Sequence, residues 1–469
     1  MSAIAGLKLL FMETKYNLDV SFPSINLDSY DPDYEKCEKS HNAQIISEKN
    51  KIELRIYYNS KTNFDRKLSL WSYHLNWKDF GKYIKTSNFS SNQRIKNIDL
   101  SESQIISTSF SSSYDSNNIS YISVFINCIK LILNPNEDKK NTSEFYLNDS
   151  GFKMVSSFYA TLFQNEEKFT IRRMDKRETF YKIGNAEFRP EFNFFTSDAR
   201  VSKEAKIIKE PKIQFRYNDN IKEKDAIRYA EIVCLLSSFY YNVKIDYTVA
   251  KIYLTNKTII IQKVIEQQLL KPTVFGLRGV GYNKGFHFLL SSNWQNSAQK
   301  NFKKLCEAIE KYNQSRVVDG SSKFLLRYNI IEICKSGKRI SSPEFEIVLN
   351  NKEVKNKYDQ ALTKLLETIS DNEQGDFKIK WESIKNKLKY KSMKSPIEEF
   401  LKTQKLKPED FPISLKDIIQ MRSDLTHGSI NSISPEKLEN ANVILYRITG
   451  ILIMNLFGIN EWEFDKHFN

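Results

Sequence analysis

The sequence predicts an α+β protein in which a strand-rich N-terminal region, residues 1–290, precedes an all-α C-terminal region, residues 291–469. Short runs of β-branched and aromatic residues with partial alternation dominate the first 215 or so residues. The apolar spacing then becomes helical from about residue 295 to the end. A chain of 469 residues can form several cores, and a further break near 215–220 would divide the N-terminal region into two subdomains.

The clearest strand candidates in the N-terminal region are Lys51–Asn59 and Tyr121–Asn134, because both are rich in β-branched and aromatic residues. Leu100–Tyr121 is crowded with Ser and Asn, which predicts a loop or an edge region. Further short strands are predicted at Lys168–Arg173 and Lys212–Tyr217. No internal repeat is visible.

The middle of the chain combines a helix, two strands and a glycine-rich segment. Lys222–Asn242 carries apolar residues at helical spacing, and Val243–Val264 returns to a strand pattern. The following glycines, from Gly276 to Gly285, resemble a phosphate-binding loop, but their spacing misses GxGxxG by one residue. A turn-rich connector is therefore favoured, and a nucleotide-binding regulator is the alternative that uses this segment.

The C-terminal region predicts a series of helices, several of which carry capping signals. Ser414 is a predicted N-cap, with Asp417 in the third helical position, and Gly428 stands where a helix commonly ends. Ser434 followed by Pro435 predicts the start of the last helix, which is apolar nearly all round and is expected inside a bundle or a dimer interface. The predicted helices lie near Ala298–Asn313, Lys323–Lys335, Lys352–Ser370, Trp381–Tyr390, Pro396–Thr403, Leu415–His427 and Pro435–Phe457.

Composition favours a polyanionic partner. The net charge of +14 and the pI of about 9.2 would attract RNA or DNA, although a basic surface can also serve solubility alone. The five cysteines are scattered and lack CxxC spacing, so neither a disulfide framework nor a metal site is expected. The cysteines are typical of the reduced, buried cysteines of a cytoplasmic protein. No apolar run is long enough to span a bilayer, which predicts a soluble protein, and no cofactor is expected.

The segment SLKDIIQMRSDLTHG contains the candidate catalytic pair, Arg422 and His427. Arg422 falls on the stripe of Leu415, Ile418 and Leu425, so it is expected on the packing face, where it needs an anion. Five residues of helix turn about 500°, so the two side chains diverge by about 140°. A second copy of the chain could bring both groups to one point.

Both residues also have purely structural interpretations. Arg422 could bind a protein carboxylate, for which Glu332 in the segment KFLLRYNIIEIC is the candidate. His427 could interact with the C-terminal end of its helix, where the dipole favours cations. Spacing alone favours these structural interpretations.

The segment from Arg422 to Gly428, followed by a long apolar helix, resembles the Rx4–6H motif of HEPN domains. More narrowly, the chain resembles the ApeA-type antiphage defence proteins of bacteria, because Phe324–Ile333 is similar to an earlier HEPN helix and Ile232–Ile252 to the stretch ahead of it. The motif resemblance covers about the last 175 residues. The family usually has Asn, Asp or His directly after the arginine, whereas this chain has Ser423 and then Asp424, which the resemblance implies as supporting residues.

The resemblance implies a metal-independent endoribonuclease that works as a homodimer through its HEPN domain. RNA, with tRNA as one candidate, would be the substrate, and the N-terminal region would release the nuclease when it senses a phage protein. His427 would act as general acid or base and Arg422 would stabilise the charged phosphate. The alternative is a non-catalytic RNA-binding or dimerisation protein with a degenerate HEPN domain.

A lysine-rich stretch, residues 378–394, is a candidate RNA-binding surface. Its lysines could bind phosphates while its two aromatic rings stack bases. The alternative is a solvated helix face that Trp381 and Leu388 anchor. The candidate RNA-binding residues are Lys385, Lys387, Lys389, Lys391, Lys394, Trp381 and Tyr390.

Overall fold

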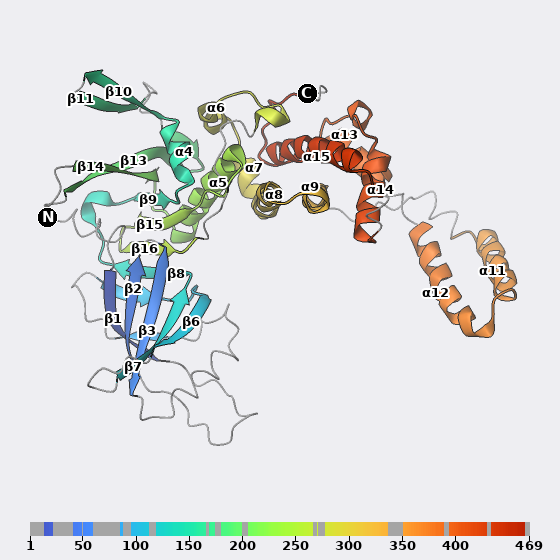
Figure 1. The fold of residues 1–469 in the computed structure, drawn as a ribbon, viewed down its shortest axis with the longest axis horizontal. Coiled ribbons are helices and arrows are strands. Elements are labelled where there is room, and N and C mark those ends of the chain that lie inside the picture. The colour runs from blue at the N-terminus through green and yellow to red at the C-terminus, as the bar shows by residue number, and fades with distance from the viewer. Residues whose placement is uncertain are drawn as a thin grey trace. The chain divides into compact units, whose positions relative to one another are not determined.

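The computed structural model divides the α+β chain into two compact units, Met1–Val274 and Phe275–Asn469, of which the first is rich in strands and the second helical (Figure 1). The sequence places this division at 290/291, and the structure places it earlier. The structure describes residues 14–21, 41–48, 50–59, 85–87, 95–111, 119–165, 168–173, 180–198, 205–265, 270, 277–335, 350–388, 394–428 and 433–464.

The first unit contains two large antiparallel sheets and one separate hairpin. In spatial order, the eight-stranded sheet consists of β12 (Tyr181–Ile183), β13 (Ala186–Asp198), β14 (Ala205–Tyr217), β9 (Thr142–Leu147), β15 (Tyr247–Tyr253), β16 (Thr258–Lys263), β8 (Cys128–Leu133) and β5 (Ile95–Asp99). The six-stranded sheet consists of β4 (Lys85–Ser87), β1 (Thr14–Ser21), β2 (His41–Glu48), β3 (Lys51–Asn59), β7 (Ile119–Ile126) and β6 (Ile105–Ser111). The remaining elements are the hairpin of β10 (Tyr159–Asn165) and β11 (Lys168–Arg173), the 3-10 turn η1 (Glu137–Lys139), and the helices α4 (Gly151–Ser156) and α5 (Glu223–Tyr241).

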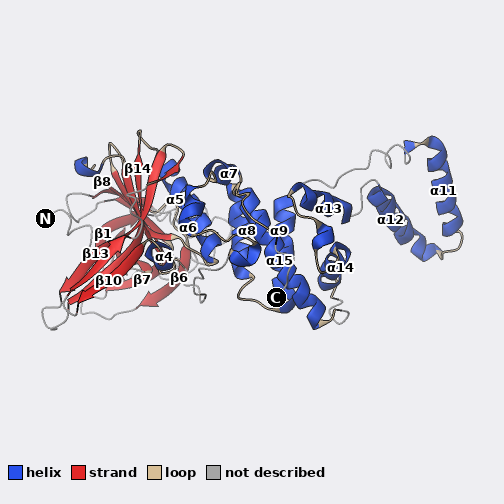
Figure 2. Ribbon diagram, turned by 90° about the horizontal axis from the view of Figure 1, so that it is seen from above, coloured by secondary structure: helices blue, strands red, loops and turns tan. Residues whose placement is uncertain are grey.

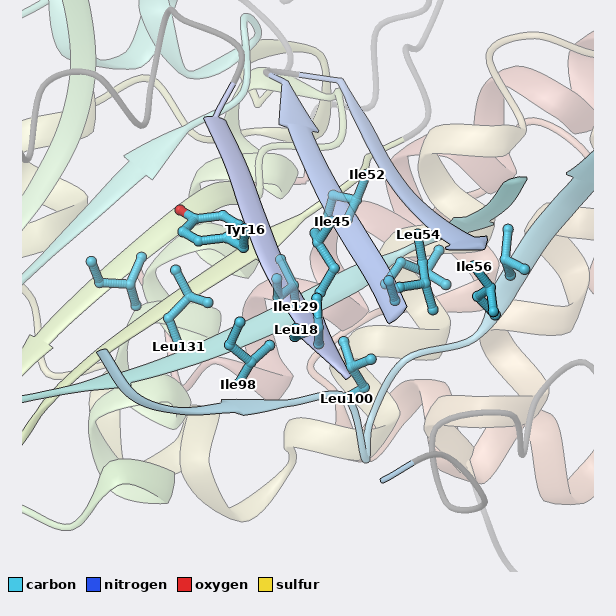
Figure 3. Packing of buried hydrophobic residues seen from close by; sticks show 14 of the residues in the cluster. Tyr16, Leu18, Ile45, Ile52, Leu54, Ile56, Ile98, Leu100, Ile129 and Leu131 are labelled. Atoms are coloured by element: carbon cyan, nitrogen blue, oxygen red, sulfur yellow. The ribbon is translucent and has the colours of Figure 1, made fainter. Parts of the chain in front are cut away.

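Side chains of both sheets form one buried apolar cluster (Figure 3). Leu18, Ile45 and Leu54 come from the six-stranded sheet, whereas Ile98 and Leu131 come from the eight-stranded one. Alternate residues of a strand point to opposite faces, so each sheet can present an apolar row to the other. The cluster therefore joins the six-stranded sheet to strands β5, β8, β9, β15 and β16 of the eight-stranded sheet.

The predicted strand at Lys51–Asn59 is confirmed as β3, and the strand pattern over 121–134 is confirmed as two strands rather than one. The run divides at Asn127 into β7 and β8, which belong to different sheets. At this break, the backbone N–H of Asn127 donates to the Gln104 carbonyl at 3.0 Å, and the Asn127 Oδ1 accepts the Gln104 backbone N–H at 2.8 Å. Within the segment expected as a loop or edge, β6 forms the edge of the six-stranded sheet.

In the second unit, α8 (Phe302–Gln314), α9 (Gly320–Lys335) and α15 (Pro435–Leu456) lie side by side, and α14 (Leu415–Thr426) packs on α9 (Figure 2). Helix α15 is buried along most of its length, which confirms its predicted interior position. No helix in the described ranges combines the length and apolar character needed to cross a membrane. The elements are η2 (Arg278–Val280), α6 (Phe286–Ser291), α7 (Gln295–Lys300), α8 (Phe302–Gln314), α9 (Gly320–Lys335), α11 (Lys352–Leu366), α12 (Asp371–Leu388), α13 (Lys394–Thr403), η3 (Pro408–Asp410), α14 (Leu415–Thr426) and α15 (Pro435–Leu456).

The segment before α6 belongs to the helical unit because it packs against α15 and the residues after it. A Cβ atom at Gly450 would lie 2.5 Å from Val280, so the missing side chain allows η2 to approach α15 closely. The backbone N–H of Glu463 donates to the carbonyl of Gly281 at 3.0 Å. These contacts explain why the division falls before residue 277 rather than at 290.

Candidate active site

Helix α14 begins at the predicted residue, Leu415, and ends at Thr426, one residue before the predicted end, so Arg422 lies within the helix and His427 is its C-cap. Ser414 is its N-cap, because its Oγ accepts the Asp417 backbone N–H at 3.1 Å and donates to the Asp417 carboxylate at 2.7 Å. Gly428 adopts a φ of +81° directly after the helix, a conformation that glycine reaches without strain. The cap and the glycine fix the ends of the helix between which Arg422 stands.

The buried face of α14 consists of Leu415, Ile418, Met421 and Leu425. Arg422 was expected on this face, but it lies at the edge of the face, because 35% of its side chain is exposed. Met421, which the sequence stripe omitted, fills the packing position instead. The guanidinium of Arg422 therefore remains accessible to solvent and to an incoming anion.

Arg422 contacts two residues of α9. Its Nη2 donates to Glu332 Oε1 at 3.3 Å, and its guanidinium carbon lies 5.9 Å from the centre of the Tyr328 ring. Burial is the main reason that the pKa of Tyr328 rises to about 12; the Glu332 carboxylate raises it further and Arg422 opposes the rise. Glu332 is thus the carboxylate partner that the structural interpretation names for Arg422.

The ion pair with Glu332 uses only one nitrogen of the Arg422 guanidinium, Nη2. In the described part of the chain, the contact from Nη2 is the single side-chain hydrogen bond of Arg422. Arginine has five N–H donors in a planar fork. The remaining donors can bind the two oxygens of a phosphate while Glu332 holds the side chain in place.

His427 lies at the C-terminal end of α14 with an exposed side chain. Its backbone N–H donates to the carbonyl of Ser423 at 3.0 Å, so the backbone, rather than the imidazole, closes the last turn. In the ranges that the structure describes, the imidazole makes no hydrogen bond or ion pair. Neither ring nitrogen of His427 thus has a partner among the described residues.

The two predicted supporting residues on α14 face local partners. The Ser423 carbonyl accepts the N–H of His427, and Asp424 Oδ1 accepts a hydrogen bond from Gln420 Nε2 at 2.8 Å. Thr426 Oγ1 donates to the carbonyl of Arg422 at 2.7 Å. These contacts stabilise the end of α14, and none of them joins Ser423 or Asp424 to the Arg422 guanidinium.

A second arginine, Arg327 of α9, is buried in the helical unit, and sequence reasoning did not single it out. Its Nη1 donates to the Asn442 carbonyl at 2.6 Å and its Nε to Ser315 Oγ at 3.2 Å. Its guanidinium carbon lies 5.1 Å from the centre of the Tyr446 ring. Burial lowers the pKa of Arg327. A charged residue inside the apolar run FLLRYNIIEI is the signal that could have revealed it.

The lysine-rich stretch is described only in part. Trp381 is half-buried between Tyr358 and Phe377, whose ring centres lie 4.9 and 6.0 Å away, so its ring packs between α11 and α12. This supports the anchoring interpretation of Trp381. Helix α12 begins at Asp371, ten residues before the predicted start. The other predicted RNA-binding residues lie outside the described side chains: Lys385, Lys387, Lys389, Tyr390, Lys391 and Lys394.

The glycine-rich segment packs against its own chain rather than forming an open loop. A Cβ atom at Gly281, whose φ is +91°, would overlap the Glu463 carbonyl oxygen at 1.7 Å. A Cβ atom at Gly279 would lie 3.3 Å from Tyr446. Gly276 lies outside the described residues. These glycines permit close packing, so they give the nucleotide-binding alternative no support.

Comparison of the chain with protein-family models, with curated proteins and with solved structures finds no match. In the parts of the chain that are described, no three His, Cys, Asp or Glu residues gather into a possible metal site. The interpretation of α14 therefore depends on its residues and their geometry.

Proposed function

We propose that the chain is a metal-independent endoribonuclease of the HEPN type, in which Arg422 and His427 cleave RNA. The observation that carries the proposal is that α14 presents a half-exposed arginine, anchored at one nitrogen, and an exposed histidine five residues later. This pair satisfies the Rx4–6H pattern. The positive charge of the chain supports a polyanionic substrate.

RNA supplies its own nucleophile, so the enzyme needs no nucleophilic side chain. The 2′-hydroxyl loses its proton and attacks the adjacent phosphorus, and the bond to the 5′-oxygen breaks. The leaving oxygen takes up a proton, so the products are a 2′,3′-cyclic phosphate and a 5′-hydroxyl. Histidine, with a reference pKa of about 6.5, can perform either proton transfer near neutral pH. Arg422 would stabilise the charge that develops on the phosphate oxygens.

The proposal requires two copies of α14. Along one helix, five residues rise about 7.5 Å and turn about 500°, so Arg422 and His427 of one copy diverge. Two-fold pairing places a second arginine and a second histidine near the same phosphodiester. By the same resemblance, the N-terminal unit would restrain the nuclease until a phage protein binds.

The test is incubation of purified protein with total RNA in the presence of EDTA. His427→Ala and Arg422→Ala should each lower the cleavage rate at least about 100-fold, because a general acid–base group and a transition-state charge partner contribute that much. His287→Ala is the matched control, since His287 is also exposed on a helix of the same unit. Undiminished cleavage by His427→Ala would exclude the mechanism.

The Arg422–Glu332 contact also favours a second candidate, a non-catalytic RNA-binding or dimerisation protein in which this ion pair is structural. That candidate predicts RNA binding without cleavage, in the wild type and in both variants. Assays with extracts of phage-infected and uninfected cells separate a restrained nuclease from an inactive one, because only the restrained enzyme gains activity.

A further inference from the structure

Helices α11 and α12 form a hairpin with an apolar seam that is only half covered. Tyr358 and Trp381 meet across this seam with ring centres 4.9 Å apart. No residue of α11 is buried, and the described side chains of α12 are half-buried or exposed. The Trp381 indole N–H is shielded from solvent and has no described hydrogen-bond acceptor. Two helices whose described side chains are all at least partly exposed are expected to need a further partner.

The exposed apolar side chains of the hairpin follow the seam. Leu365 is 40% exposed and lies seven residues after Tyr358; Ile384 is 48% exposed and lies seven residues after Phe377. Seven residues turn about 700°, so each lies within about 20° of the aromatic residue on its own helix. The half-open seam therefore continues as one apolar stripe on both helices.

The charges of the hairpin favour a protein partner of like composition over nucleic acid. Between Lys352 and Leu388 the sequence has eight lysines and seven carboxylates, whereas the whole chain has a net charge of +14. A nucleic-acid surface needs an excess of positive charge. Interleaved charges of both signs can instead pair with a second copy of themselves across a two-fold axis.

We propose that the α11–α12 hairpin pairs with the same hairpin of a second chain to form an intermolecular four-helix bundle. In such a bundle, the apolar seam of each hairpin would be covered by the apolar seam of the other. The inference deepens the proposed function and rests on it in one respect: a site shared by two α14 helices needs a surface that holds two chains together. Pairing of the hairpins is measurable without any cleavage.

The test is sedimentation velocity on the full-length protein. Wild-type protein should sediment at twice the chain mass of 55.0 kDa. Ile384→Glu should weaken association at least about 100-fold, because the two-fold axis would place one new glutamate from each chain in the apolar interface. Ile379→Glu is the matched control: Ile379 is 70% exposed on the same helix, but it lies about 200° around from Phe377, away from the seam.

A second variant separates loss of the interface from local unfolding of the hairpin. Leu365→Ala keeps helix propensity, removes apolar seam area, and should weaken association about tenfold with an unchanged circular dichroism spectrum. A monomeric wild type, or dimers that persist equally in Ile384→Glu and Ile379→Glu, would overturn the inference. If the dimer forms as expected but His427→Ala still cleaves RNA, the proposed mechanism fails and the hairpin interface stands.

Discussion

Arg422 is held at one corner of its guanidinium, and Glu332 is the residue that holds it. The two side chains are 35% and 40% exposed, so solvent screens their attraction and the pair adds at most about 1 kcal/mol to stability. Its importance is geometric. A long, half-exposed side chain that would otherwise sample many rotamers is directed along the surface of α9, beside Tyr328.

Replacement of Glu332 tests this positioning role. Glu332→Ala should lower RNA cleavage about tenfold, because Arg422 loses its orientation. Glu332→Gln should retain most of the activity, since a carboxamide oxygen still accepts the Nη2 hydrogen bond. Single-turnover cleavage and thermal unfolding, measured on both variants, separate positioning from stability. Faster cleavage by Glu332→Ala would instead identify the carboxylate as a competitor of the phosphate.

At the scale of elements, Arg327 joins three parts of the helical unit. It extends from α9 to the carbonyl of Asn442 in α15 and to Ser315 directly after α8. Tyr446 of α15 covers its guanidinium and stacks on Tyr312 of α8, with ring centres 5.2 Å apart. Since α9 also carries Glu332 and Tyr328, Arg327 helps to set the position of the helix that orients Arg422.

Arg327→Ala should lower the free energy of unfolding of the helical unit by about 2–4 kcal/mol, because it removes two hydrogen bonds and leaves a cavity. Arg327→Met should cost less, since an apolar chain of similar length fills the space without a buried charge. Denaturant unfolding measures both effects, and Lys303→Ala, on the exposed face of α8, is the control. Equal losses for Ala and Met would contradict the packing part of the argument.

The sequence predicted the elements whose pattern is local. Lys222–Asn242 and the last helix show apolar periodicity, the last helix also has the predicted cap at Ser434, and both are helices in the structure. The start of α12 was missed because Asp371–Lys380 is polar and includes Gly375, so its helical pattern is weak. The contact between Arg422 and Glu332 joins residues 90 positions apart, and the sequence offered it only as one of two interpretations.

Pairings between distant strands could not be predicted at all. Strand β5 lies in the chain between β4 and β6 of the six-stranded sheet, yet it pairs with β8 at the edge of the other sheet. Each strand has the same local alternation whichever sheet it joins. The exposure of Arg422 also depends on tertiary packing, because the helical stripe alone does not decide whether Met421 or Arg422 fills the core.

At the scale of the whole molecule, the two units differ in their buried acidic groups. Burial alone would raise the pKa of Glu53, but hydrogen bonds from Arg55, Ser123 and Lys51 lower it to about 2. Burial would likewise raise the pKa of Glu144, but the pKa is lowered because the ammonium of Lys212, 3.0 Å from Oε1 of Glu144, stabilises the carboxylate. In the described part of the helical unit, the carboxyl group with a lowered pKa is that of Asp417, which lies on the surface.

Acid should therefore destabilise the strand-rich unit first. A lowered folded-state pKa contributes stability that is complete above the unfolded pKa, about 4.5 for glutamate, and is lost as the pH falls toward the folded value. Between about pH 5 and pH 3, hydrogen exchange should accelerate more in the sheets than in α8, α9 and α15. Glu53→Gln should reduce this pH dependence by on the order of 1 kcal/mol after allowance for solvent screening, whereas Glu137→Gln, at an exposed carboxylate, should not. Earlier opening of the helices would contradict this assignment.

The hydrogen bond from Glu463 to Gly281 has a topological consequence. It joins the first described turn of the helical unit to the segment that follows α15, and Phe464 packs on Phe411 beside it, with ring centres 5.5 Å apart. These contacts hold the two ends of the described part of the helical unit next to each other. In a circularly permuted helical unit, a short linker could therefore connect these two ends. The new chain termini would lie in the turn between α11 and α12, and the contacts between the helices would be kept.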